Sequence, residues 1–515
     1  MSRWGPSVDG SLTTLGVVAA GVIALSVLSL QSGPVATGPV ASDGTVVTGT
    51  TTGGNDTVPG TTTTTGKTAG KNGTVAAGKN GTTTTTVGGR TVTGPAGPAT
   101  TPGCNSSNNG GSTDRGVTAT KIELGATVVQ SGIGASFLGP VRVALEAVRN
   151  DVNRAGGICG RQLNLNLVDD GWDPTRGFQF IQNLVQDKKV FALAVNPSSE
   201  GLRIASGQKY LARTKTPVVG SDGMLNSQYQ DPWIWPVAAS TVSTMHIMAA
   251  DACTRLHKKN FGIVFDTKYH FGVEGAYAFN AAVKRCTGAD IPGYLDPSSG
   301  GRCDSSTRFC AISAGQTAYD AENKGFNDAC FAASSGHPQC DFVALLLEPN
   351  EAKNFLRNGT TAQVQLGLAQ TLFTRDFAST CGTICDGAMV WTGYNPAIEE
   401  FANLAAVRTY VSTVRSASPD VDVLNQFLVG GYAGMRLLAD ALAKVGPNLT
   451  RDRLAATLDS MDYDGGLTTP LKWRPGNHFA NSSMHAFSIQ FKGGFNGFRS
   501  VTGWIRDPYL GQDVT

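Results

Sequence analysis

The sequence lacks the features that mark nucleic-acid-binding proteins and the best-known classes of enzyme. Its 515 residues carry 41 Lys and Arg against 39 Asp and Glu, so neither a basic surface for nucleic acid nor an acidic tail is expected. It contains no G-x-S-x-G nucleophile elbow, no H-E-x-x-H zinc motif and no G-x-G-x-x-G after a strand. We therefore expect no catalysis, no cofactor and no nucleic-acid partner.

The N-terminal part has no aromatic residue between Trp4 and Phe137, but it contains one long apolar run. Residues 12–30 are uncharged and nineteen long, about the length that crosses a bilayer as a helix. With Arg3 before the run, this predicts a membrane anchor with residues 1–11 in the cytoplasm. A cleaved signal peptide, with small residues near Ser29, is the alternative. Both interpretations place the rest of the chain outside the cytoplasm.

Residues 31–115 have few apolar side chains and consist mainly of Gly, Thr, Ala, Pro and Val. The sequence AGKNGT occurs twice, at 69–74 and 77–82, beside runs of five threonines. Such a segment cannot bury enough apolar surface to offset the entropy of ordering it. It is therefore predicted to be a disordered tether.

Alternating and helical hydrophobic patterns begin near Thr118. Residues 121–129 and 162–168 alternate like strands, and an apolar face typical of a helix lies between them. The same β-α-β rhythm restarts after Ser240, which predicts two α/β lobes, each with a doubly wound parallel sheet. A long amphipathic helix is predicted over 425–445 and a terminal hairpin over 487–504.

Three sequence blocks in the first of these lobes resemble a known family. They are IELGAT at 122–127, NRAGGICGRQL at 153–163 and DDGWDP at 169–174. In type and spacing they resemble the type 1 periplasmic solute-binding proteins, specifically the branched-chain amino-acid (Leu/Ile/Val) receptors. The resemblance covers nearly the whole chain after the tether.

The resemblance implies two lobes joined by a three-crossing hinge, with the ligand gripped between them. The lobes are expected at 116–240 with 386–479 and at 241–385 with 480–515, with crossings near Ala239, Asp386 and Phe479. In parallel sheets, ligands bind outside the carboxyl ends of the strands, so the loops there should supply the site. The candidate ligand-binding residues are Ser131, Ser198, Ser199, Ser221, Asp222, Tyr269, Phe271, Glu348, Gln370 and Tyr394.

The resemblance gives some of these residues a role, and each role has a structural alternative. Ser198 or Ser199 would bind a ligand carboxylate, or would only cap the following helix, as serine commonly does. Phe271 or Tyr269 would stack on the ligand, or would only fill the core.

One departure from the family concerns the ligand's ammonium group. Amino-acid receptors hold it with an acidic residue after the strand that corresponds to 364–368, where this chain has Ala369-Gln370-Thr371. Glu348 is the nearest substitute. Because a buried ammonium without a carboxylate is costly, amides, urea-like solutes, aromatic acids and short peptides stay open as ligands beside amino acids.

The ten cysteines are even in number, which fits disulfide formation in an exported protein. Three local pairs are predicted in loops of the second lobe, and one pair links successive helices. The pairs are Cys303/Cys310, Cys330/Cys340, Cys381/Cys385 and Cys253/Cys286, which leaves Cys104 and Cys159. A metal site is disfavoured, because none of the six histidines has zinc-ligand spacing to a cysteine pair.

These observations predict an extracytoplasmic protein that captures a small polar ligand between two lobes for an ABC-type importer. The partners expected are the ligand, an ABC permease and the membrane. The alternative is a membrane-tethered sensor with no transport role. Fold alone does not separate the two.

Overall fold

The computed structural model describes residues 82–87, 90–95, 104–330, 340–357 and 364–511. The predicted anchor at 12–30 lies outside the described residues. Among the described helices, none combines the length and the apolar character needed to cross a bilayer. Two short strands, β1 (Thr82–Val87) and β2 (Arg90–Pro95), pair as an antiparallel hairpin within the segment predicted to be disordered.

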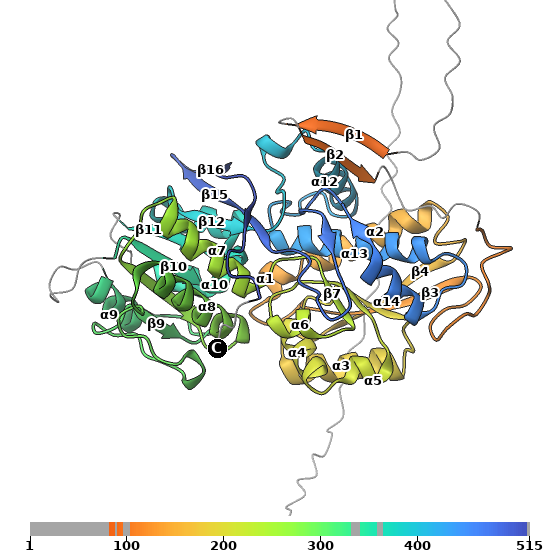
Figure 1. Ribbon diagram of the computed structural model, residues 1–515, viewed down its shortest axis with the longest axis horizontal. Coiled ribbons are helices and arrows are strands. Elements are labelled where there is room, and N and C mark those ends of the chain that lie inside the picture. Colours follow the sequence, from red (N-terminus) through yellow and green to blue (C-terminus); the bar gives the residue numbers. More distant parts are fainter. Residues whose placement is uncertain (1–81, 88–89, 96–103, 331–339, 358–363, 512–515) are drawn as a thin grey trace, which may run out of the picture. The chain divides into compact units, whose positions relative to one another are not determined.

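The first lobe contains a parallel five-stranded sheet in the order β4-β3-β5-β6-β7. Its edge strands β4 and β7 are labelled in Figure 1. Its strands are β3 (Lys121–Val128), β4 (Gln162–Asp169), β5 (Ala192–Ala194), β6 (Val218–Ser221) and β7 (Ile234–Pro236). Its first helices are α1 (Ala135–Leu138), α2 (Val141–Arg154), α3 (Pro174–Gln186), α4 (Ser199–Gly207), α5 (Tyr210–Thr214) and α6 (Asn226–Gln230).

Alternation along β3 explains why helices cover both faces of this sheet. Ile122, Leu124 and Ala126 are fully buried in the core that includes α2. On the opposite face, Leu184 of α3 packs so closely against Gly125 that an added Cβ would lie 3.1 Å from it. The first lobe is therefore doubly wound, as predicted.

The second lobe contains an eight-stranded mixed sheet in the order β16-β15-β12-β11-β10-β8-β9, with β17 paired to β15. Its strands are β8 (Phe261–Asp266), β9 (Phe309–Ile312), β10 (Phe342–Leu346), β11 (Gln365–Leu368), β12 (Met389–Thr392), β15 (Ser483–Phe491), β16 (Phe495–Ser500) and β17 (Ile505–Arg506). Strands β8 to β12 run parallel, whereas β15, β16 and β17 pair antiparallel at one edge, so the predicted parallel sheet is correct only for the centre.

Helices cover the two faces of this second sheet in two groups. Helices α7 (Thr241–Thr254) and α8 (His270–Thr287) pack with Ile263 and Phe265 of β8. The opposite face, with Val264, is covered by α9 (Asp320–Cys330), α10 (Pro349–Leu356) and α11 (Arg375–Cys381). Short 3-10 turns lie at η1 (Pro297–Ser299), η3 (Gln370–Leu372), η4 (Gly382–Cys385) and η5 (Glu399–Phe401).

After β12 the chain returns to the first lobe. It forms α12 (Ala405–Ala417), α13 (Gln426–Val445), α14 (Arg451–Ser460) and the small pair β13 (Asp462–Tyr463) and β14 (Leu471–Lys472). Helix α13 lies directly on β6, where Gly220 has φ +79° and a Cβ on it would lie 2.2 Å from Cα of Gly434. This contact between two glycines carries the N-terminus of α13 to the carboxyl ends of the strands.

The three crossings between the lobes are tied together by one side chain. The buried Asn481 donates from Nδ2 to the carbonyl of Val237 at 3.1 Å and to that of Gly393 at 3.3 Å. The second crossing therefore lies after Thr392, not near Asp386 as predicted. The reason is that β12 pairs with β11 and β15 and so belongs to the second sheet.

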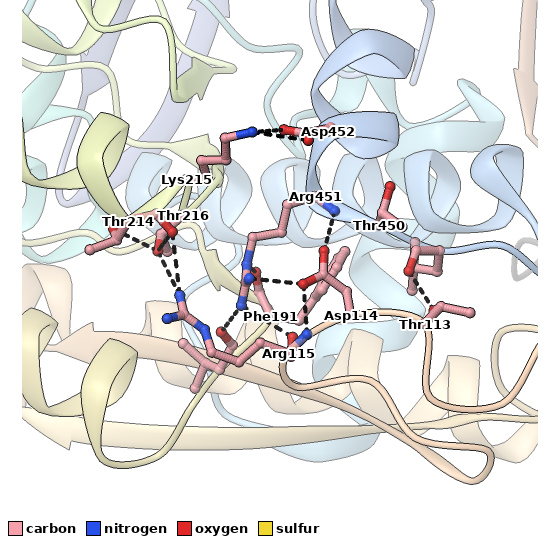
Figure 2. A network of polar contacts seen from close by, with 12 residues as sticks. Thr113, Asp114, Arg115, Phe191, Thr214, Lys215, Thr216, Thr450, Arg451 and Asp452 are labelled. Atoms are coloured by element: carbon pink, nitrogen blue, oxygen red, sulfur yellow. Dashed lines mark hydrogen bonds and ion pairs between the residues drawn. The ribbon is translucent and has the colours of Figure 1, made fainter.

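Residues 104–115, predicted as the end of the tether, are instead part of the folded first lobe. Asp114 accepts hydrogen bonds from the backbone N of Arg451 at 2.7 Å and from its guanidinium at 3.0 Å (Figure 2). The same guanidinium donates to the carbonyls of Phe191 and Val190. Polar contacts hold this segment in place, so its low apolar content led to a wrong prediction of disorder.

All ten cysteines are paired. The bonds are Cys104–Cys159, Cys253–Cys286, Cys303–Cys310, Cys330–Cys340 and Cys381–Cys385. The four predicted pairs are confirmed, and the two remaining cysteines fasten the 104–115 segment to the loop before β4.

Candidate functional site

A small cavity of about 10 Å³ lies where segments of both lobes and the hinge meet. Its polar wall comes from Asp222 after β6, Gln370 after β11, Tyr394 after β12 and Gln426 at the start of α13. Its apolar wall is formed by Val141, Val195, Pro197, Ala238 and Phe427. Three of the four polar residues follow the carboxyl ends of strands, where ligands bind in open α/β sheets.

The loop after β5 is held in an unusual backbone conformation. Val195 and Asn196 have φ of 62° and 54°, in the left-handed region that a β-branched residue rarely adopts. The Asn196 side chain fixes the loop by accepting a hydrogen bond from Thr127 N at 2.7 Å. Strain of this kind persists only where the surrounding structure enforces it, and it is concentrated at functional sites.

Ser198 and Ser199 follow in the same loop and are buried. Ser198 is the N-cap of α4, yet its side chain makes no capping hydrogen bond, and its hydroxyl lies instead beside the carboxyl of Asp170. The capping role that competed with ligand binding is therefore not filled by this hydroxyl. Ser221, at the end of β6, has a buried Oγ without a hydrogen-bond partner among the described residues.

Asp170 lies beside Ser198 and is fully buried. Burial raises the pKa of Asp170, although the hydroxyls of Ser198 and Thr127 and the backbone N of Trp172 favour the ionised form. Its neighbour Asp173 is the N-cap of α3 and accepts from Arg176 N at 2.7 Å.

Asp222 is the carboxylate that faces the cavity. Its Oδ1 accepts from Nε2 of Gln228 at 2.9 Å and from the backbone N of Met224 at 3.3 Å, and both of these donors are neutral. Burial raises the pKa of Asp222 to about 7, and the negative charge of Glu200 contributes to the shift. Tyr394 is close enough that Asp222, in addition to burial, raises the pKa of its phenol.

The two glutamines that line the cavity each have a buried side-chain oxygen without a hydrogen-bond partner among the described residues. Gln370 donates from Nε2 to the carbonyl of Ala239 at 3.3 Å in the hinge, which fixes its amide orientation. Within the described residues, no donor reaches Oε1 of Gln370 or Oε1 of Gln426, although both side chains are buried.

An aromatic stack joins the two lobes. Trp172, in the loop after β4, stacks on Tyr269 of the second lobe with ring centroids 3.9 Å apart and planes at 13°. Phe271 lies further away, at 6.3 Å from Trp172, and is buried in the core of the second lobe. Tyr269 therefore contacts an aromatic side chain of the protein where a ligand contact was predicted.

Polar contacts also cross between the lobes. Glu200, at the start of α4, accepts from His270 N at 2.7 Å and lies 3.0 Å from His270 Nδ1. Despite burial, the His270 side chain and backbone keep the pKa of Glu200 below its usual value. Asn350 of α10 donates to the carbonyl of Ile133 at 3.2 Å. Together these contacts hold the two lobes closed on each other.

Of the ten predicted site residues, only Asp222, Gln370 and Tyr394 line the cavity. Glu348 is the N-cap of α10, where its carboxylate accepts from the backbone N of Asn350 and Glu351 in a capping box. Burial raises the pKa of Glu348 to about 7. Ser131 is exposed, in the loop after β3, near Asp169.

Sequence reasoning missed Gln426, Phe427 and Trp172. Gln426 and Phe427 follow Asn425, which caps α13 by accepting from the backbone N of Phe427 and Leu428, and this cap was a readable signal. Trp172 lies inside the quoted block DDGWDP, where an apolar ring in a polar turn was a second signal.

Comparison with known proteins gives a consistent result. The family model described as "Periplasmic binding protein" matches residues 121–300 and 313–494. No curated protein is significantly similar in sequence.

Solved structures share the fold at low identity. A possible leucine/isoleucine/valine-binding protein from Rhodopirellula baltica is 19% identical with a TM-score of 0.60, over 74% of this chain and 96% of that one. A fatty acid ABC transporter substrate-binding protein from Thermomonospora curvata is 17% identical with a TM-score of 0.61, over 76% and 94%. A solute-binding protein of an ABC transporter from Rhodopseudomonas palustris, in complex with 3,4-dihydroxybenzoic acid, is 16% identical with a TM-score of 0.61, over 75% and 99%.

The names of these neighbours mention different ligands. The neighbours therefore identify the fold of this chain but not its ligand. The family match covers well over half of the chain and includes both lobes. The chain therefore belongs to the periplasmic binding protein family, whose members bind solutes and are not enzymes.

Proposed function

We propose that this chain is the extracytoplasmic receptor of an ABC-type importer and captures a small polar solute between its lobes. The observation that carries the proposal is the cavity at the hinge, where buried polar atoms from both lobes have no partner within the described residues. Such atoms are costly to bury, and a polar ligand would supply the missing hydrogen bonds. The named solute-binding neighbours support the same role.

The closed cleft also supports a receptor that opens and shuts. A cavity of about 10 Å³ holds a group no larger than a water molecule, so a whole solute can enter only if the lobes part. Hinge closure around ligand is a known motion of two-lobed binding proteins. The shared anchor on Asn481 gives the three crossings a common pivot.

Five disulfides support a location outside the reducing cytoplasm. We extend the proposal to the N-terminal segment, which we expect either to anchor the protein at the outer face of the membrane or to be removed as a signal peptide. N-terminal sequencing of the mature protein distinguishes the two.

A thermal-shift screen of the full chain tests the function, with amino acids, amides, peptides, sugars, amines and aromatic acids as probes. A solute at about 100 times its dissociation constant should stabilise the folded state by about 2.7 kcal/mol. In small-angle scattering, the radius of gyration of the complex should be no larger than that of the free protein. Absence of any shift across the panel would contradict solute binding.

The importer role needs a second measurement. Uptake of the identified solute should fall in cells that lack this chain and recover when the chain is restored. Binding without any effect on uptake would favour a tethered sensor over an importer receptor.

A further inference from the structure

Positive charge gathers at the amino edge of the first sheet, away from the hinge cavity. Arg115, Lys189 and Lys215 precede the parallel strands β3, β5 and β6, which begin at the same edge. The guanidinium of Arg451 lies among them, because it donates to the carbonyls of Arg115 at 3.1 Å and Val190 at 3.0 Å (Figure 2). Four segments that are distant in sequence therefore bring cations to one place.

We call this group the basic edge, and its charge is not balanced locally. Its seven cations and three anions are Arg115, Lys188, Lys189, Arg213, Lys215, Arg451 and Arg453, with Asp114, Asp187 and Asp452. The rest of the chain keeps 34 of the 41 Lys and Arg and 36 of the 39 Asp and Glu. The basic edge is therefore positive, whereas the remainder of the chain is slightly negative.

Most cations of the basic edge are free to meet a partner. Asp114 pairs with Arg451, and Asp452 pairs with Lys215. Within the described part of the chain, no carboxylate forms an ion pair with the four other exposed cations, which are Lys188, Lys189, Arg213 and Arg453. These side chains point positive charge at solvent without a counter-charge from the fold.

Two of the lysines occupy backbone positions that suit glycine better. Lys189 has φ of 53°, and Lys215, which ends α5, has φ of 48°. Glycine adopts this left-handed conformation without steric cost and is the usual residue just past a helix. Both lysines are exposed, so burial in the core does not explain them. Strained positions of this kind are concentrated where a side chain has a function.

We propose that the basic edge docks the first lobe on an anionic membrane surface, by contact with lipid phosphates. Lysine and arginine near an anionic leaflet are attracted to it over about a Debye length. Residues 104–115 form part of this edge, so the N-terminal part of the chain joins the lobe on the side that would face the lipid. The inference goes beyond solute binding and does not depend on the solute.

The position of the basic edge also fits a binding protein. The hinge cavity lies at the carboxyl ends of the strands, for example at Asp222 after β6, whereas the basic edge lies at their amino ends. Docking would therefore leave the cleft open to solvent. The two exposed large apolar side chains of the described residues, Leu295 and Val501, are both in the second lobe. The contact would therefore rest on charge, and we expect salt to weaken it.

Acetylation of lysines by acetic anhydride, followed by mass spectrometry, tests the proposal on the full chain. With vesicles of equal parts phosphatidylcholine and phosphatidylglycerol, Lys188 and Lys189 should react more slowly at low salt and recover at high salt. Lys324 and Lys492, which are exposed in the second lobe, should react as they do without vesicles. Vesicles of phosphatidylcholine alone should protect none of them, which separates docking from anchoring by the N-terminal segment.

A double variant connects the protection with the strained lysines. Lys189→Gly with Lys215→Gly should lower the docked fraction by about fivefold for each lysine removed, so Lys188 should lose its protection. The thermal midpoint should not fall, because glycine relieves both positive φ angles. A merely structural role of these lysines predicts the opposite pattern, with lower stability and unchanged protection.

Two other variants keep the test specific. Arg213→Gln with Arg453→Gln removes the same charge from exposed side chains without carboxylate partners, and it tests the surface if the glycine variant folds poorly. It should also reduce the protection of Lys188 and Lys189. Lys492→Gln is the matched control, an exposed lysine of the second lobe, and should leave the protection unchanged.

Several outcomes would overturn the proposal. Equal protection on neutral vesicles would show that anchoring alone brings the lobe to the lipid. Equal protection of Lys324 would show adsorption without a defined face. Protection by soluble poly(glycerol phosphate) but not by anionic vesicles would make the partner an anionic polymer and not a membrane. The solute screen is a separate experiment, so the solute-binding function stands or falls independently.

Discussion

Asp222 should make the stability of the protein depend on pH in a way that needs no ligand to observe. Burial raises its pKa from 3.8 to about 7 in the folded state. Between these two values the folded protein binds a proton that the unfolded chain has released. The stabilisation from this proton is therefore greatest at low pH and is lost as the pH rises through 7.

The size of the effect follows from the two pKa values. Between pH 5 and pH 8, the contribution of Asp222 to the free energy of unfolding should fall by about 2.5 kcal/mol. Asp222→Asn removes the ionisation and can keep the Oδ1 hydrogen bonds with Gln228 and Met224. The variant should therefore lose about 2.5 kcal/mol less stability than the wild type over this pH range.

Urea denaturation at pH 5 and pH 8, followed by circular dichroism, measures this difference. Asp266 and Glu348, whose pKa values burial raises to about 6 and about 7, contribute pH dependence of the same sign to both proteins and cancel in the comparison. The exposed Asp420→Asn variant should match the wild type. Equal pH dependence of the wild type and Asp222→Asn would refute the reasoning that this carboxylate is buried without a counter-charge.

Three further predictions concern binding, closure and stability. Replacing Ser198 and Ser199 together by Ala should weaken solute binding by about tenfold in calorimetry while the protein stays folded, because Ser198 does not cap α4 through its side chain; unchanged affinity would remove this loop from the site. Trp172→Leu should increase the radius of gyration in small-angle scattering, since the ring stack between the lobes is lost, and an unchanged radius would show that the other contacts suffice for closure. Asp114→Ala should destabilise the first lobe by about 3 kcal/mol by leaving a buried guanidinium unpaired; Asp452→Ala, which breaks an exposed ion pair, should cost under about 1 kcal/mol, and similar losses in both would contradict the importance of burial.

Local patterns were sufficient where apolar residues recur in the sequence with the period of a strand or a helix. The strands β3 and β4 lie within a residue of their predicted bounds, and helix α2 lies between them as predicted. Strand β12 was assigned to the wrong lobe for the opposite reason. Its four residues are all buried and carry no period, and its lobe is decided by pairing with β11 and β15, which are distant in sequence.

The distinction between local sequence patterns and distant contacts also applies to the candidate site and to the start of the folded region. Asp222 and Gln370 were predictable because each follows a predicted strand, and the carboxyl ends of parallel strands meet at one edge. Tyr394 was a candidate because it lies near the second predicted crossing. Gln426 was not, because it begins a helix and reaches the cavity only through the contact of α13 with β6. The pairing of Asp114 with Arg451 spans 337 positions, and composition cannot reveal a polar contact of that range.

Buried polar side chains near Arg451 and at the hinge differ in how many of their hydrogen bonds are made, and this difference bears on function. All three guanidinium nitrogens of Arg451 have acceptors, so its burial is compensated within the first lobe. At the hinge, Gln370 and Gln426 are as deeply buried and yet each has a side-chain oxygen without a partner among the described residues. Nε of Arg115 and Nη1 of Arg161 in the first lobe also have no partner among the described residues, but each of these guanidinium groups donates to a carbonyl through another nitrogen. Polar atoms without partners where the lobes meet favour ligand binding. Closure of the empty cleft gives these atoms no hydrogen bond, so a ligand that supplies the missing hydrogen bonds stabilises the closed form.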